Sequence, residues 1–115
     1  MAMIEHISKP AALALLTWRT AEMGGRSSGP PSKGVYAANC RFVIDPKQAT
    51  RTLRSDNYFS ILIEKRHEID SQTWRCDIGF LVEGEIDHLL TAGTRIDIME
   101  GPKIVGNATI IERII

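Results

Sequence analysis

The 115-residue sequence has only two cysteines and no net charge, because fourteen Lys and Arg side chains balance fourteen Asp and Glu side chains. Cys40 and Cys76 fit neither a CxxC motif nor a zinc-ligand spacing. We therefore expect two small buried thiols, and a single disulfide between them is the alternative. The balanced charge argues against a dedicated nucleic-acid binder, since such proteins usually carry a basic excess.

Long apolar runs are also missing. No stretch approaches the roughly 20 apolar residues of a membrane-spanning helix. Residues 1–10 lack a basic region followed by an apolar one, so they do not match a secretory signal, and we expect a cytoplasmic protein without membrane association. The length and the 43% apolar share are typical of one soluble globular domain spanning residues 1–115.

Signatures of catalysis and of cofactor binding are missing as well. The sequence has no Gly-x-x-x-x-Gly-Lys-Ser/Thr loop that would cradle a phosphate. His6, His67 and His88 belong to no nucleophile or metal-ligand motif, so we expect solvated histidines. We therefore expect no enzyme activity, no cofactor, no bound metal and no nucleotide.

What the sequence does contain is a series of strand-like segments around one long loop. Residues 24–34 are rich in Gly, Pro and Ser and predict a surface loop. In 74–82, apolar residues alternate with polar or small ones, which predicts a strand with one buried face; the apolar positions are Trp74, Cys76, Ile78, Phe80 and Val82. Further strands are predicted at 36–44, 58–64, 95–99 and 103–114. Residues 11–20 fit a helix or a strand, because an Ala- and Leu-rich half precedes Leu-Thr-Trp-Arg.

Two other groups of residues have a local interpretation. The basic residues Arg51, Arg54, Lys65 and Arg66 lie among the acids Asp56, Glu64, Glu68 and Asp70. This mixture predicts a solvated hairpin with salt bridges; the alternative is a phosphate-binding patch together with Lys33 and Lys103. For the apolar C-terminal residues Ile110, Ile111, Ile114 and Ile115, we expect core packing, with contact to a partner as the alternative.

Two segments carry a pattern that matches a known family. Residues 22–26 read Glu-Met-Gly-Gly-Arg, and a proline-containing loop separates them from Lys-Gly-Val-Tyr at 33–36. Residues 93–106 read Gly-Thr-Arg-Ile-Asp-Ile-Met-Glu-Gly-Pro-Lys-Ile-Val-Gly. The chain thus resembles the C-terminal β-barrel, the third domain, of the translational GTPase elongation factor Tu. That family has acidic-x-Gly-Gly-Arg, a Gly-Tyr after the loop and a final hairpin Gly-x-x-Phe-x-Ile-x-Glu-Gly-x-x-x-Val-Gly. The resemblance covers residues 13–114, and in 45–72 only the strand-like pattern is shared.

The resemblance implies an all-β fold, a closed antiparallel barrel of about six strands of Greek-key type. Residues 1–10 would form an N-terminal extension and residues 11–115 the barrel. Because residues 12–20 align with the first strand of the family, we expect a strand there despite the helix propensity.

The matched glycines and arginine have structural roles under this interpretation. We expect Gly101 to supply a turn conformation that a Cβ would hinder, and Gly106 to let the last strand pass a neighbour closely. Gly24 and Gly25 would end a strand and turn the chain. The guanidinium of Arg26 would donate hydrogen bonds that order the loop.

In the family, this barrel helps to hold aminoacyl-tRNA at its acceptor and T stems, packs against the GTPase domain and contacts the nucleotide exchange factor. By resemblance, Glu100 and Gly101 fall on the hairpin-turn positions that contact tRNA, and Asn39 falls near a glutamine position. Lys103 lies where the family often has arginine. The candidate partner- or RNA-binding residues are Arg26, Lys33, Asn39, Glu100, Gly101 and Lys103.

Two departures from the family pattern affect the functional prediction. Pro102 replaces a second glycine and removes a backbone donor. The family motif Tyr-Arg-Pro-Gln becomes Tyr-Ala-Ala-Asn at 36–39, without the arginine that could contact a phosphate. With the neutral charge, these changes favour a non-catalytic protein-interaction module, for instance a regulatory or immunity-like protein. The alternative is an RNA-binding module that contacts a tRNA stem in translation.

Overall fold

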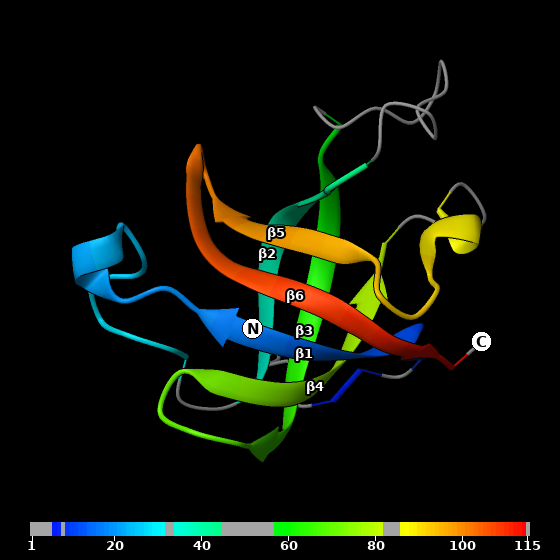
Figure 1. The fold of residues 1–115 in the computed structure, drawn as a ribbon, viewed down its shortest axis with the longest axis horizontal. Helices are drawn as coiled ribbons and strands as arrows, with labels where there is room; N and C mark the ends of the chain where they lie inside the picture. Colours follow the sequence, from blue (N-terminus) through cyan, green and yellow to red (C-terminus); the bar gives the residue numbers. More distant parts are fainter. Residues whose placement is uncertain (1–5, 8, 32–33, 45–56, 82–85, 115) are drawn as a thin grey trace, which may run out of the picture.

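The alternating segments form a closed barrel of six antiparallel strands, seen in Figure 1. The computed structural model describes residues 6–7, 9–31, 34–44, 57–81 and 86–114. The strands are β1 (Ala12–Trp18), β2 (Val35–Phe42), β3 (Phe59–Glu68), β4 (Thr73–Phe80), β5 (Arg95–Glu100) and β6 (Lys103–Arg113). Two short 3-10 turns, η1 (Ala21–Met23) and η3 (Asp87–Leu89), lie between strands. The predicted all-β barrel is confirmed.

The strands follow the order β1-β4-β3-β2-β5-β6 around the barrel. Strands β2, β3 and β4 follow one another both in the chain and in the sheet, and β1 lies on the other side of β4, paired with it. This arrangement is a Greek key. The β5–β6 hairpin pairs with β2 on one side and with β1 on the other, so it closes the barrel and covers the sheet edges.

Strand β1 settles the ambiguity of residues 11–20 in favour of a strand. Its even-numbered residues are buried, as a period of two requires. The strand pairs with β4 along one edge and with β6 along the other, so its backbone groups are hydrogen-bonded on both sides. Tertiary pairing thus overrides the local preference of Ala and Leu for a helix.

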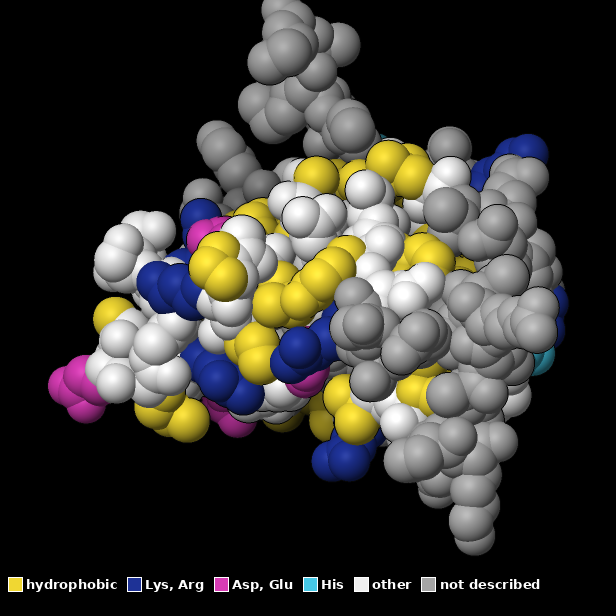
Figure 2. All heavy atoms as spheres, turned by 90° about the horizontal axis from the view of Figure 1, so that it is seen from above, with side chains coloured by type: hydrophobic (Ala, Val, Ile, Leu, Met, Phe, Trp, Pro, Cys, Tyr) yellow, Lys and Arg dark blue, Asp and Glu magenta, His cyan; other side chains and the backbone are white. Residues whose placement is uncertain are grey.

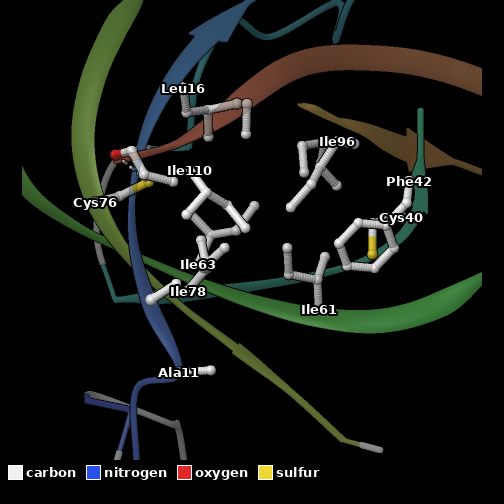
Figure 3. Close-up of a cluster of buried hydrophobic side chains, with 14 of the residues drawn as sticks. Ala11, Leu16, Cys40, Phe42, Ile61, Ile63, Cys76, Ile78, Ile96 and Ile110 are labelled. Atoms are coloured by element: carbon white, nitrogen blue, oxygen red, sulfur yellow. Dashed lines mark hydrogen bonds between the residues drawn. The ribbon is translucent and has the colours of Figure 1, made fainter. Parts of the chain in front are cut away.

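The core consists of aliphatic, aromatic and cysteine side chains that point inward from the six strands. Figure 3 shows Leu16, Ile61, Ile63, Ile78, Ile96 and Ile110 converging on the barrel axis, and each is at most 1% exposed. The predicted inward face of β4 is confirmed from Trp74 to Phe80, while Val82 lies outside the described residues. Of the four C-terminal isoleucines that were expected to pack in the core, the structure confirms this only for Ile110. Ile111 and Ile114 are 37% and 47% exposed, because alternation turns Ile111 outward and Ile114 lies past the end of β6; Ile115 is outside the described residues.

The two ends of the barrel are closed differently. At one end, the Trp18 ring meets the rings of Trp74 and Tyr36 edge-on, with centroids 5.1 and 5.3 Å apart. At the other end, Leu89 of η3 is buried together with Ile86 and Leu90 on either side of that turn. Strand β5 runs from the second end to the first, so its first and last residues belong to different ends.

Both cysteines are buried and free, so the alternative of a disulfide is wrong for this structure. Burial raises the pKa of each thiol to about 12. Cys76 Sγ lies 3.6 Å from the carbonyl oxygen of Ala14. These thiols act as small core side chains.

Residues 6–7, the segment before β1 that is placed by these contacts, lie against the outside of the barrel. The Ile7 N–H donates to Glu64 Oε1 at 2.9 Å, and His6 Nδ1 lies 2.6 Å from Glu64 Oε2. A Cβ on Gly79 would lie 3.1 Å from the Ile7 side chain, so Ile7 crosses β4 where that strand has no side chain. Glu64 therefore holds this segment on the barrel.

Of the salt bridges expected on β3, one forms within the predicted cluster and one forms to an acid outside it. Lys65 Nζ lies 3.7 Å from Glu68, and an Arg66 nitrogen lies 3.5 Å from Asp77 on β4. Three further members of this cluster, Arg51, Arg54 and Asp56, lie outside the described residues.

Candidate interaction surface

An ion pair joins the long loop after η1 to the β5–β6 hairpin. Arg26 Nε donates to Glu100 Oε2 at 2.9 Å, and another Arg26 nitrogen donates to the Gly29 carbonyl oxygen at 2.8 Å. The guanidinium also lies over the Tyr36 ring, 5.2 Å from its centroid. Arg26 thus orders its own loop, as expected, and also fixes that loop to the end of the barrel.

The backbone of the Gly-Gly pair explains why the loop reaches this position. Thr20 caps η1 with its Oγ1, which accepts from the Met23 N–H at 3.2 Å. Gly24 follows with φ +88°, a left-handed conformation that disfavours a Cβ. The Gly25 N–H donates to the Thr20 carbonyl oxygen, and a Cβ on Gly25 would lie 2.0 Å from the Arg19 carbonyl oxygen. Only glycine fits at position 25.

Tyr36 completes the polar cluster at this end of the barrel. Its hydroxyl donates to Glu100 Oε2, the same oxygen that accepts from Arg26. Burial raises the pKa of Tyr36, and the hydrogen bond and the charge of Glu100 raise it further. The phenol therefore stays neutral and remains a donor. The Arg26–Glu100–Tyr36 cluster has no net charge.

The hairpin turn beside this cluster has the conformation that the sequence predicted. Gly101 has φ +61°, in the left-handed region that favours glycine. Gly106 lies where β6 crosses β1, and a Cβ there would lie 3.1 Å from the Leu16 side chain and 3.2 Å from the Thr17 carbonyl oxygen. Both expected structural roles are confirmed.

Next to this turn, a groove of about 360 Å³ runs across the outer faces of β3, β2 and β5. Outward residues of the three strands line it: Asn39 is opposite Ser60 on β3 and opposite Met99 on β5. Leu62 and Leu81 add apolar surface, and Leu81 is 68% exposed. Glu100 and Gly101 close the groove at the hairpin end. Hydrophobic side chains also reach the surface between cationic ones on the face seen in Figure 2.

The structure brings most of the sequence-predicted residues to this region. Asn39, Glu100 and Gly101 line the groove, and Arg26 contacts Glu100 at its end. Lys103 lies just past the turn, paired with Glu100 in the β-ladder, and its side chain is exposed. Lys33 lies outside the described residues.

The sequence reasoning missed the apolar part of the surface. Leu62, Leu81 and Met99 were not among the candidate residues: Leu62 is on the outer face of β3, Leu81 directly follows β4, and Met99 is a buried residue of β5 at the groove. A signal was present, because an apolar residue on the polar face of an amphipathic strand is out of pattern. Leu81 follows Arg75, Asp77 and Gly79 on the face opposite the core side chains.

Asp97, on the outer face of β5, is also paired. Arg41 donates to Asp97 Oδ2 at 3.1 Å, and the Asn107 amide donates to Asp97 Oδ1 at 2.9 Å.

Among the described residues, no cluster of three or more His, Cys, Asp or Glu side chains could hold a metal ion. No helix in the described part of the chain is long and apolar enough to cross a membrane.

Comparison of the chain with protein-family models, with curated proteins and with solved structures gave no match. The fold class that the elongation factor Tu motifs implied is present. The relationship to that family stays a prediction from those motifs.

Proposed function

We propose that this chain is a non-catalytic protein-interaction module that binds a partner protein in the groove across β3, β2 and β5. The observation that carries the proposal is the composition of the groove. Leu62 and Leu81 form its apolar surface beside the buried Met99, and the exposed fraction of Leu81, 68%, leaves most of that side chain available for burial. An apolar hollow with a polar rim is typical of protein–protein contact sites.

The polar groups of the groove suit a polypeptide. Asn39 is exposed, and its amide makes no hydrogen bond with the residues that the structure describes. An amide offers one acceptor and two donors, so it can pair with a peptide N–H and C=O together. The Ser60 hydroxyl lies on the neighbouring strand at the same level, which places a second donor and acceptor beside it.

The state of Arg26 favours protein over RNA as the partner. Its guanidinium is occupied by Glu100, Gly29 and the Tyr36 ring, so this cation is engaged within the molecule and is not free to contact a phosphate. RNA binding depends on cations that release counterions from phosphates. Because Lys103 is exposed beside the turn and can contact a phosphate, tRNA binding is the second candidate function.

Site-specific photocrosslinking in the native host tests this proposal. A photoreactive residue replaces Asn39 in the groove, and a matched variant carries it at Arg75, an exposed position of β4 outside the groove. We expect one defined protein to crosslink at position 39 and not at position 75, and Leu81→Asp to abolish the crosslink. Recovery of tRNA in place of protein at position 39 would favour the second candidate. Identical products at both positions would contradict the proposal.

A further inference from the structure

A second hollow, of about 530 Å³, lies at the opposite end of the barrel from the hairpin turn. The end of β2, η3 and the segment before β5 enclose it. Its volume falls within the range of small-molecule sites, roughly 300–1,000 Å³. Strand β5 begins at this hollow with Arg95 and ends at Glu100, so the two sites are roughly 17 Å apart at about 3.3 Å per residue.

One wall of this hollow is apolar. Val43, Ile44 and Leu89 line it, and Leu89 is only 5% exposed because it also belongs to the plug of the barrel end. Backbone hydrogen bonds fix the opposite wall: the Gly93 N–H donates to the Ile110 carbonyl oxygen at 2.8 Å and the Thr94 N–H donates to that of Thr91 at 3.1 Å. These hydrogen bonds therefore fix the backbone of the segment before β5 where it lines the hollow.

Four polar side chains line the same space. Thr91 Oγ1 and Thr94 Oγ1 lie 3.3 Å apart, so one hydroxyl can donate to the other and leave a hydroxyl hydrogen for a ligand. His88 comes from η3 and Arg95 from the start of β5. Neither His88 nor Arg95 forms an ion pair or side-chain hydrogen bond with another described residue, although both line the hollow.

Arg95 is the one formally charged side chain among the described residues that line the hollow. No Asp or Glu is among the described residues that line it. The described acid nearest to Arg95 on the outer face of β5 is Asp97, whose two oxygens are taken by Arg41 and Asn107. An unpaired guanidinium beside an imidazole and two hydroxyls favours an anion, and its planar fork matches a carboxylate or a phosphate.

From this arrangement we propose that the second hollow binds a small organic anion. Its carboxylate or phosphate group contacts Arg95, His88 and the two threonine hydroxyls, and its short apolar part lies against Val43, Ile44 and Leu89. This site is separate from the protein-binding groove and does not depend on it. Small-molecule sites commonly combine such an apolar wall with a few convergent polar groups.

Titrations followed by amide NMR spectra test this proposal on the full chain. The probes are hexanoate and hexyl phosphate as anions and hexanol as a neutral molecule of the same apolar length. We expect both anions to shift the amide resonances of Thr91, Thr94 and Arg95 saturably, with the stronger binder identifying the head group. Hexanol should not saturate these resonances in the same concentration range.

Two variants separate the charge of Arg95 from general effects. Arg95→Gln should weaken anion binding about tenfold or more, since a hydrogen bond to a charged group is lost. Arg75→Gln removes an exposed cation of β4 that lines neither site and should leave binding unchanged. Well-dispersed spectra of both variants establish that they fold. Three results would overturn the proposal. They are anion binding by Arg95→Gln as tight as that by the unmodified chain, hexanol binding as tight as anion binding, and no binding of either anion.

Discussion

Arg26 and Glu100 are 74 residues apart in the chain, yet the guanidinium of one donates to the carboxylate of the other at 2.9 Å. The pair joins the loop between β1 and β2 to the hairpin between β5 and β6. Both residues belong to the motifs that resemble elongation factor Tu, so the two segments that carry this resemblance meet in space. The contact also removes Arg26 from the cations available to an external phosphate.

The Arg26–Glu100 pair should show measurable coupling in a double-mutant cycle. Arg26→Ala and Glu100→Gln each lower the free energy of unfolding, and the coupling between them should be about 0.5–1 kcal/mol, since both side chains are partly exposed. Urea unfolding of the four proteins gives this quantity. Strictly additive effects would show that the pair contributes nothing to stability.

Gly25 should be the least replaceable glycine of the loop. Gly25→Ala places a Cβ 2.0 Å from a backbone oxygen, so we expect a loss of about 3 kcal/mol or more in the free energy of unfolding. Gly29→Ala is the matched control: its φ of +79° is unfavourable for alanine, but nothing lies within 4 Å, and the cost should be about 1–2 kcal/mol. Thermal unfolding compares the two, and equal losses would argue against the clash at Gly25.

Strand existence and the inward face could be predicted from sequence because both depend on a local period of two. The alternation from Trp74 to Phe80 predicts β4 and its core side chains without any tertiary information. Residues 11–20 show the limit of this reasoning. Their own preference is divided, and pairing with β4 and β6, which no local pattern contains, makes them a strand.

The candidate groove could be predicted only in part for a similar reason. Glu100, Gly101 and Asn39, which line the groove, could be predicted from the motifs that resemble elongation factor Tu. Leu62, Leu81 and Met99 come from three separate segments, and their meeting depends on the strand order β3-β2-β5 and on its register. Alternation predicts that Leu62 and Leu81 point outward, but it does not predict that they lie beside each other and beside Met99.

The two thiols should react only when the protein unfolds. Cys40 and Cys76 are both 0% exposed, and burial holds the pKa of each at about 12. At pH 8, the native protein should therefore show almost no reaction with a disulfide reagent over minutes, because the thiolate is the reacting species. In urea without reductant, two thiols should titrate. Rapid reaction of the native protein would contradict the burial of these side chains.

Acid should release the segment before β1 from the barrel. Burial favours the neutral form of Glu64, but hydrogen bonds from Ile7 and His6 and the nearby charge of Arg66 outweigh it and lower the pKa of this carboxyl. A lowered pKa means that the contact stabilises the fold above the ordinary pKa of a glutamate, about 4.3, and is lost as the pH falls through the lower folded value.

The Ile7 amide resonance reports this titration directly, since its N–H donates to Glu64. Its chemical shift should change with a midpoint below about 4.3. In Glu64→Gln, the acid transition of this resonance should disappear. A midpoint at or above 4.3 would show that the hydrogen bonds do not favour the charged carboxylate.

The affinity of the partner protein that crosslinks at position 39 tests the central claim most directly. Calorimetry compares the unmodified chain with Leu81→Ala in the groove and with Leu15→Ala, an exposed leucine on the outer face of β1. We predict that Leu81→Ala weakens binding at least about fivefold, as truncation of a buried contact residue costs more than about 1 kcal/mol, and that Leu15→Ala leaves the Kd unchanged. Equal affinities of Leu81→Ala and the unmodified chain would contradict the groove as the binding site.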